Sequence, residues 1–381
     1  MTLPSTDNQP AAPAHGVAAA DTTSRTLMRF SARILGFAVV FVIAGELFFR
    51  FAIPAAELPI SQFNAEYKFR RYDPAGPRTG RFTSGRYAQA QGVWRVNDQG
   101  WISHRDYLSA KARGKPAVAY LGSSFVEGFY SDVDTHIAAR MEHRAGGKYD
   151  VYNFGMSDSV PSEHLRVAAY AAKAFEPRVL FFFCSSWHLA ASLSPAPGRQ
   201  RWRLEGGRVV DRPVSPLRSG RIKALAKRSA IIRYLVLNAH WRPKLAPANA
   251  GGGGTVLNAA QAGKGKARPV AELRLLAETM VRRAVAQHPG ARVVVVTGGP
   301  YASDLPPQAP LVDQLLAQAC RTYGAEHVDL LPAFHADWLQ HHEPFQYAHD
   351  FHWNARAFDV IAQRLVAVVA AKPVVAAPVT P

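Results

Sequence analysis

Short apolar runs alternate with longer amphipathic stretches along this chain between residues 116 and 371. Five runs have the length and composition of strands: 116–121, 151–154, 179–183, 293–297 and 328–331. The runs near 179 and 293 are continuously apolar, as expected for parallel strands covered on both faces. Helices are predicted between and after them, at about 125–144, 161–175, 270–288, 309–323 and 354–371. Such alternation predicts an α/β fold with a parallel sheet.

A serine follows the first predicted strand, within Gly122-Ser123-Ser124. Far downstream, Asp350 and His352 lie two residues apart. A serine, an imidazole and a carboxylate are the parts of a nucleophilic acyl-transfer site. An early serine with a late, nearly adjacent acid and histidine differs from the arrangement of G-x-S-x-G hydrolases. We therefore predict Ser124 as nucleophile, His352 as base and Asp350 as the residue that orients it.

Four sequence blocks carry a resemblance to a known family: Arg95–Trp101 (R-x-N-x-x-G-aromatic), Gly122–Gly128 (G-D-S-F-x-x-G), Val151–Gly155 (N-x-G) and Asp350–Asn354 (D-x-H-W-N). In this order the chain resembles the SGNH (GDSL-type) hydrolases, and more closely their membrane-anchored bacterial members. The resemblance implies a flavodoxin-like three-layer sandwich with a five-stranded parallel sheet. It also implies an oxyanion hole that includes the N–H groups of Ser124 and Gly155, and no cofactor.

The chain departs from the family pattern at two places. Ser123 stands where the family has the aspartate of G-D-S. Cys184-Ser185-Ser186-Trp187 stands where the family has G-x-N-D, so the asparagine that completes the oxyanion hole is missing. Ser186 falls nearest its place and is the expected third donor. Loss of one such donor typically lowers the rate of catalysis by a factor of about 10²–10³. The expected active site is therefore a weakened or adapted form of the family's site.

An apolar run covers residues 34–53, and Glu46 and Arg50 are its only charged residues. The two can pair at i, i+4, and the length approaches that needed to span a bilayer. Arginines precede the run, which favours a cytoplasmic N-terminus. A retained signal anchor, a cleaved signal peptide and a buried core helix are the alternatives. We favour the anchor, which places the catalytic domain on the periplasmic side of the inner membrane.

Composition divides the rest of the chain. The predicted parts are a disordered leader at 1–33, an irregular approach at 54–94, a hydrolase-like domain at 95–371 and a disordered tail at 372–381. A Gly- and Pro-rich insertion at about 188–269 is expected to be flexible and to shape the cleft, with a basic helix at 219–241. Cys184 and Cys320 are expected to be buried thiols, and no metal site is expected.

The net charge of +17 indicates either an anionic partner or a solvated basic surface without a partner. No pattern of a nucleic-acid-binding module accompanies the arginines, so nucleic acid is not expected. An anionic membrane surface or an acidic polysaccharide suits an anchored protein better. The leading hypothesis is a serine esterase acting on O-acyl groups of a cell-envelope carbohydrate or lipid. The alternatives are an O-acyltransferase with the same triad and a non-catalytic glycan-binding or scaffold protein.

Overall fold

The computed structural model describes residues 17–112, 114–214, 228–241, 268–348 and 350–372, with side chains from Arg25 onward except that of Ser186. Its central sheet has five parallel strands: β5 (Ala117–Gly122), β6 (Asp150–Gly155), β7 (Val179–Phe183), β10 (Arg292–Thr297) and β11 (Glu326–Asp329). Their spatial order is β11-β10-β7-β5-β6. Counted along the chain, this is the flavodoxin-like order 2-1-3-4-5. The predicted fold class is confirmed.

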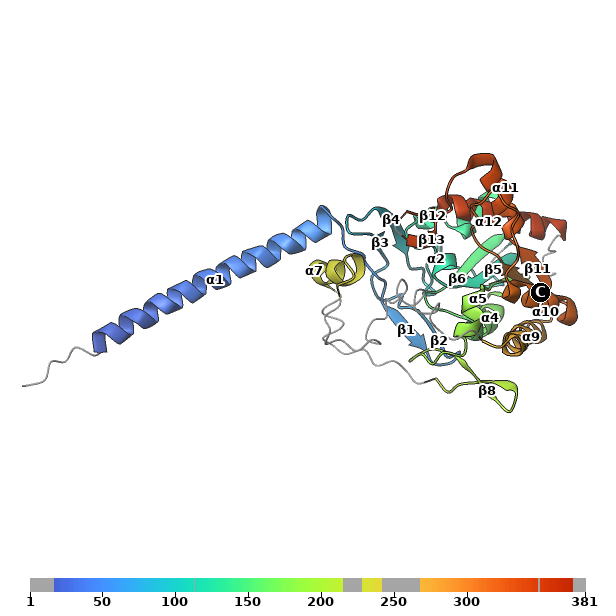
Figure 1. Ribbon diagram of the computed structural model, residues 1–381, viewed down its shortest axis with the longest axis horizontal. Helices are drawn as coiled ribbons and strands as arrows, with labels where there is room; N and C mark the ends of the chain where they lie inside the picture. The colour runs from blue at the N-terminus through green and yellow to red at the C-terminus, as the bar shows by residue number, and fades with distance from the viewer. Residues whose placement is uncertain (1–16, 113, 215–227, 242–267, 349, 373–381) are drawn as a thin grey trace, which may run out of the picture.

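Two layers of helices cover the sheet (Figure 1). Successive side chains of a strand face opposite sides, so Phe181 packs into one core and Phe182 into the other. One layer contains α4 (Pro161–Phe175), α9 (Val270–Gln287) and α10 (Leu311–Tyr323). The other contains α3 (Ile137–Arg144), α11 (Leu331–His341) and α12 (Ala355–Ala371). This double coverage explains the continuously apolar strands.

The single helix predicted at 125–144 is wrong. The segment forms a short α2 (Ser124–Glu127), a 3₁₀ turn η1 (Val133–Thr135) and then α3. Gly128 ends α2 in the left-handed conformation, with φ of 96°, which is a common helix C-cap. A side chain at this position would also meet the ring of His136 at 2.3 Å. The break leaves Ser124 at the start of a one-turn helix.

The approach segment at 54–94 is not irregular, which corrects the prediction. It forms two antiparallel hairpins, β1 (Ser61–Asn64) with β2 (Phe69–Tyr72) and β3 (Thr79–Ser84) with β4 (Ala90–Arg95). Large rings lie among its polar residues, and burying them outweighs the polar composition. The buried rings that join the main core are Phe69, Tyr72, Phe82 and Trp94.

A long helix, α1 (Val17–Phe51), precedes these hairpins. The predicted disorder is therefore wrong for residues 17–33, while residues 1–16 lie outside the described part. The stretch Arg25–Phe51 is long and apolar enough to cross a membrane, and its most apolar window contains no buried residue. That exposure excludes the alternative of a buried core helix. Figure 1 shows α1 projecting away from the sandwich.

The insertion after β7 contains ordered elements. They are α5 (Ser186–Ala191), the hairpin β8 (Trp202–Glu205) with β9 (Arg208–Asp211), α7 (Ala230–Arg233) and a π-helical turn η2 (Tyr234–Asn238). Trp202 is fully buried, so this hairpin is packed rather than flexible. The helix predicted at 219–241 is only partly described, because 215–227 lie outside the described residues, as does the Gly-rich stretch at 242–267.

Candidate active site

The structure brings Ser124, His352 and Asp350 together. Ser124 opens α2 directly after β5, while the other two lie on β13 (Asp350–Trp353), which pairs with β12 (Gln346–Tyr347). His352 Nε2 lies 2.9 Å from Ser124 Oγ. His352 Nδ1 is hydrogen-bonded to Asp350 Oδ1, which also accepts the backbone N–H of His352 at 2.8 Å. The geometry is that of a serine–histidine–carboxylate relay.

The electrostatics fix the roles of the two imidazole nitrogens. Burial by itself would raise the pKa of Asp350, but the hydrogen bonds and charge of His352 lower this pKa below its ordinary value. An ionised Asp350 holds the proton on Nδ1 and leaves the Nε2 lone pair facing the serine hydroxyl. Asp350 Oδ2 also accepts the hydroxyl of Ser84 at 3.3 Å. Ser84 ends β3 and was not predicted to contribute.

Aromatic rings enclose the imidazole of His352. The ring centroids of Phe125, Phe129 and Tyr130 lie 5.0, 5.2 and 5.5 Å from it. Only 4% of Ser124 and 1% of His352 are exposed. Such walls exclude water and strengthen the electrostatic interactions within the site.

Gly155 ends β6 against the backbone of α2. A Cβ atom at this position would lie 2.4 Å from the amide nitrogen of Glu127, so only glycine fits. Its N–H donates to Asn153 Oδ1 at 2.8 Å. The amide predicted as an oxyanion donor is therefore already hydrogen-bonded in this structure. The N–H of Ser124, in the first turn of α2, has no acceptor within the helix.

The segment that replaces the family's asparagine places a histidine in the site region. Ser186 opens α5, but its side chain lies outside the described residues. His188 is 5% exposed, and its ring lies edge-on to Phe125 with centroids 6.3 Å apart. Its Nδ1 is 2.6 Å from Ser185 Oγ, and its buried Nε2 has no partner among the described atoms.

Burial, together with the neighbouring His164 and Arg201, keeps the pKa of His188 well below its ordinary value. The ring is therefore neutral near pH 7. If Ser185 donates to Nδ1, the ring proton lies on Nε2, which then is a free donor. In the sequence, the signal for this residue is a histidine three positions after Ser185.

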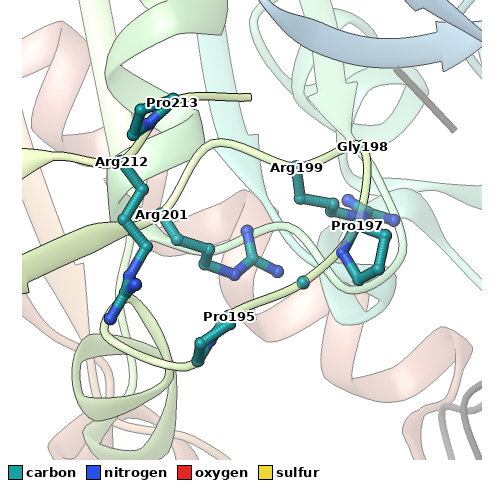
Figure 2. A pocket seen from close by; sticks show the side chains of 8 residues that line it. Pro195, Pro197, Gly198, Arg199, Arg201, Arg212 and Pro213 are labelled. Carbon is teal, nitrogen blue, oxygen red and sulfur yellow. The ribbon is translucent and has the colours of Figure 1, made fainter. Parts of the chain in front are cut away.

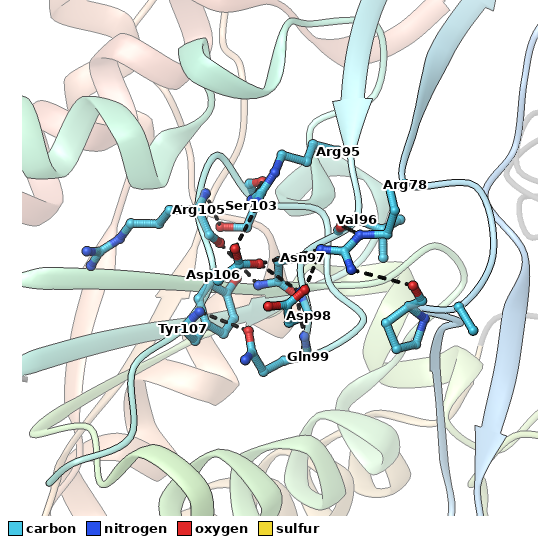
Figure 3. Close-up of polar contacts among 12 residues, drawn as sticks. Arg78, Arg95, Val96, Asn97, Asp98, Gln99, Ser103, Arg105, Asp106 and Tyr107 are labelled. Atoms are coloured by element: carbon cyan, nitrogen blue, oxygen red, sulfur yellow. Dashed lines mark hydrogen bonds and ion pairs between the residues drawn. The ribbon is translucent and has the colours of Figure 1, made fainter. Parts of the chain in front are cut away.

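The Arg95–Trp101 block forms a hydrogen-bonded loop, and Gln99 Oε1 in this block accepts the N–H of Tyr107 at 2.8 Å (Figure 3). Asn97 Oδ1 closes a tight loop by accepting the N–H groups of Gln99 and Trp101 at 3.1 and 2.9 Å. Downstream of this loop, the Tyr107 hydroxyl donates to the carbonyl of Asn153 at 2.6 Å and accepts its N–H at 2.9 Å. The block therefore positions the strand end that carries Gly155, without touching Ser124 Oγ.

Glu127, three residues after the nucleophile, is fully buried. Its carboxyl group is hydrogen-bonded to the hydroxyls of Tyr72 and Ser157. Burial raises the pKa of Glu127 to about 7, although these hydrogen bonds act in the opposite direction. Glu127 thus ties the approach hairpin to the loop that follows Gly155.

A cavity of about 340 Å³ opens beside that loop (Figure 2). Its described lining contains three guanidinium groups and no carboxylate; the residues are Pro195, Ala196, Pro197, Gly198, Arg199, Arg201, Arg212 and Pro213. Two of the arginines are buried and form ion pairs with Glu163, Arg199 at 3.1 Å and Arg201 at 3.4 Å. Glu163 itself does not line the cavity. Arg201 also donates to the carbonyl of Asp158 at 3.2 Å.

Solved structures of lipolytic enzymes are similar to this chain. One is a member of the lipolytic G-D-S-L family from Veillonella parvula, 10% identical, covering 67% of this chain and 98% of its own, with a TM-score of 0.36. Another is a lipase/acylhydrolase from Enterococcus faecalis, 13% identical, covering 68% and 96%, also with a TM-score of 0.36. No protein-family model matches the chain, and no curated protein matches its sequence.

Proposed function

We propose that this protein is a serine esterase that hydrolyses O-acyl esters through an acyl-enzyme. The observation that carries the proposal is the continuous hydrogen-bonded relay from Ser124 through His352 to Asp350. Ser124, His352 and Asp350 are all buried. Their side chains are therefore held in position before a substrate binds, as nucleophilic catalysis requires.

In the first step, Ser124 Oγ forms a bond to the acyl carbonyl carbon while His352 Nε2 takes the hydroxyl proton. The carbonyl oxygen carries the negative charge. The tetrahedral intermediate then collapses, the ester C–O bond breaks, and His352 returns the proton to the leaving alcohol. A water molecule repeats the sequence on the acyl-enzyme and releases the free acid. Asp350 stabilises the imidazolium in both halves.

The N–H of Ser124 and the Nε2–H of His188 are the donors that we assign to the developing oxyanion. His188 replaces the missing asparagine amide, since it is buried beside Phe125 and holds an unpaired ring nitrogen. Gly155 adds a third donor when Asn153 releases its N–H. The prediction of Ser186 as a donor stays a prediction.

The substrate class that we propose is an acylated envelope carbohydrate or lipid outside the cytoplasm. The apolar α1 supports an anchored, periplasmic enzyme at the inner membrane. The arginine-lined cavity supports a carbohydrate that carries carboxylate or phosphate groups, because guanidinium groups bind both in a bidentate manner. Arg199 and Arg201 of its lining donate to the carbonyls of Ser157 and Asp158, in the loop that follows Gly155 at the carboxyl end of the strands, where α/β folds bind ligands.

A fluorophosphonate probe tests the nucleophile in the full-length protein. We expect labelling of the wild type and complete loss in Ser124→Ala. The matched control is Ser123→Ala, since the neighbouring hydroxyl is equally buried but has no hydrogen-bond partner among the described groups. Labelling that persists in Ser124→Ala, or that disappears in Ser123→Ala alone, contradicts the assignment.

Acyl transfer is the second candidate. The aromatic rings around His352 and the burial of Ser124 favour it, because a water-poor site lets a bound hydroxyl compete with water for the acyl-enzyme. Product analysis with oligosaccharide acceptors separates the two activities: release of free acid alone excludes transfer. A third candidate, a non-catalytic binding protein, requires that Ser124→Ala leave cellular function unchanged.

A further inference from the structure

Glu46 is the single carboxylate in the apolar run of residues 34–53, and the structure shows what it contacts. Glu46 Oε2 accepts the N–H of Ala230 at 2.8 Å, and Oε1 accepts that of Ile231 at 3.4 Å and is hydrogen-bonded to Ser229 Oγ. These groups form the start of α7, whose amides would otherwise have no acceptor. Glu46 therefore caps a second helix that belongs to the insertion, more than 180 residues away in sequence.

Further contacts join α1 to the insertion at this junction. The rings of Phe49 and Tyr234 stack with centroids 4.0 Å apart. Arg50 pairs with Glu46 at 3.6 Å and donates to the carbonyl of Arg228 at 3.3 Å. Figure 1 shows α7 beside the end of α1.

The same segment is fastened to the catalytic domain at its other end. The side-chain amide of Asn238, at the end of η2, donates to Thr83 Oγ1 at 3.0 Å and to the carbonyl of Gly85 at 3.2 Å. Its Oδ1 accepts the N–H of Ala56 at 3.0 Å. Residues 229–241, which we call the strut, thus join α1 to the end of β3.

The outer side of the strut carries exposed apolar side chains. Ile232 and Val236 lie four residues apart and are 42% and 39% exposed, while Trp241 is 58% exposed. Basic residues flank them: Arg228 directly precedes the strut, Arg233 lies on it and Arg50 lies on α1. A segment with exposed apolar side chains and adjacent arginines has the character of an interfacial membrane segment, and tryptophan is enriched at membrane–water interfaces.

The position along α1 fixes the depth. Glu46 lies five residues before the end of α1 at Phe51, which is about 7.5 Å along the helix axis. With the end of α1 at Phe51 placed at the bilayer surface, the start of α7 lies about 7.5 Å below it, within the layer of about 5–10 Å in which interfacial helices bury their apolar faces. Phe48 and Phe51 of α1 are themselves 48% and 79% exposed beside it.

We propose that the strut lies in the lipid surface, with Ile232, Val236 and Trp241 immersed at the boundary of headgroups and acyl chains. The partner is a phospholipid bilayer with anionic headgroups. This proposal rests on the proposed function only in that α1 spans a membrane; it is independent of the ester chemistry. The strut then fixes the orientation of the catalytic domain relative to α1, so that α1 is not a flexible tether.

Quenching by brominated lipids tests the proposal. Full-length protein is reconstituted into vesicles that contain phosphatidylglycerol and brominated phosphatidylcholine. The bromine atoms of the phosphatidylcholine lie near the headgroup end of its acyl chains. The chain has seven tryptophans, so the comparison is between variants. We expect clear quenching of the wild type and loss of most of it in Trp241→Phe. The matched control, Trp338→Phe on the distant α11, should keep the wild-type quenching.

Equal quenching in Trp241→Phe and wild type overturns the proposal, and so does an absence of quenching in protein whose α1 is inserted. Running the same measurement on Ser124→Ala separates it from catalysis, because that variant tests lipid contact without any esterase activity. In a second measurement, Glu46→Ala should accelerate hydrogen exchange at the amides of 230–233. Unchanged exchange there overturns the capping role of Glu46.

Discussion

The hydroxyl of Ser84 donates to Oδ2 of Asp350 at 3.3 Å, although the two residues are 266 positions apart. Ser84 ends β3, in a segment that precedes the five-stranded sandwich. Asp350 belongs to the last described strand. The approach hairpins are therefore part of the active-site support and not merely a connection to α1.

Replacing Ser84 with alanine should lower kcat while leaving KM nearly unchanged. We expect the hydrogen bond from Ser84 to Asp350 to contribute about 1 kcal/mol, which corresponds to a loss of about fivefold in kcat. Steady-state kinetics with a chromogenic acyl ester measures it. Thr79→Ala, at the other end of the same strand, is the control and should retain full activity. Equal losses in both variants would mean that the strand as a whole, rather than the Ser84 bond, had been disturbed.

Gly155→Ala should both destabilise the protein and inactivate it. The added Cβ would lie 2.4 Å from the backbone nitrogen of Glu127, so α2 and β6 must move apart, at a cost of about 1–3 kcal/mol. Denaturant unfolding and fluorophosphonate labelling measure the two effects. Gly290→Ala meets nothing within 4 Å and should behave as wild type. A fully active Gly155→Ala would contradict the close packing described above.

Glu127 should make stability fall as pH rises. Its folded pKa of about 7 lies above the ordinary value of 4.5 because of burial. The folded state thus holds a proton that the unfolded state releases, and this contribution is full below pH 4.5 and lost as pH rises to 7 and beyond. The total is about 3 kcal/mol at most. Glu127→Gln should remove this slope, which unfolding midpoints between pH 5 and pH 8 will show.

His188→Ala should lower kcat by about 10²–10³ if Nε2–H stabilises the oxyanion. His188→Asn restores a neutral N–H donor and should recover a large part of that loss. KM should change little in either variant. A role in packing alone predicts the reverse pattern, with similar kcat in both variants and a lower unfolding midpoint.

Arg212→Gln should raise KM for esters of anionic carbohydrates by about tenfold, since a charged hydrogen bond contributes about 1.5 kcal/mol. The KM for a neutral acyl ester should not change. Arg203→Gln is the control, because Arg203 pairs with Glu205 at 2.9 Å on the same hairpin and does not line the cavity. An identical change for charged and neutral substrates would rule out the cavity as an anion site.

Patterns in the sequence predicted the sandwich well because its signals are local. The run at 179–183 coincides with β7, and the stretch at 161–175 coincides with α4. The first follows from a continuous apolar run and the second from its alternation with the strands; Pro161 lies in the first turn of α4, where proline is favoured. The split of 125–144 was missed because Gly128 ends α2 through a backbone angle that composition alone does not reveal.

The site was predictable only where motifs carried it. Ser124, Asp350 and His352 come together as expected, but Ser84, Tyr72 and Ser157 are ordinary hydroxyl residues whose contacts depend on tertiary packing. The hydrogen bond from Gly155 to Asn153 is likewise invisible in the sequence. The role of the strut could not be foreseen either, since Glu46 was read as the partner of Arg50 and its main contacts lie on the insertion.

The order of the triad along the chain has a consequence for biosynthesis. The nucleophile follows the first strand of the sheet, whereas the base lies in β13, just before Asn354 caps α12 by accepting the N–H of Ala357 at 3.1 Å. A chain that is still being translated therefore has a serine without a base. On the proposed esterase mechanism, cleavage can begin only after β13 has been synthesised and α12 has packed against α3, so incomplete chains cannot act on esters.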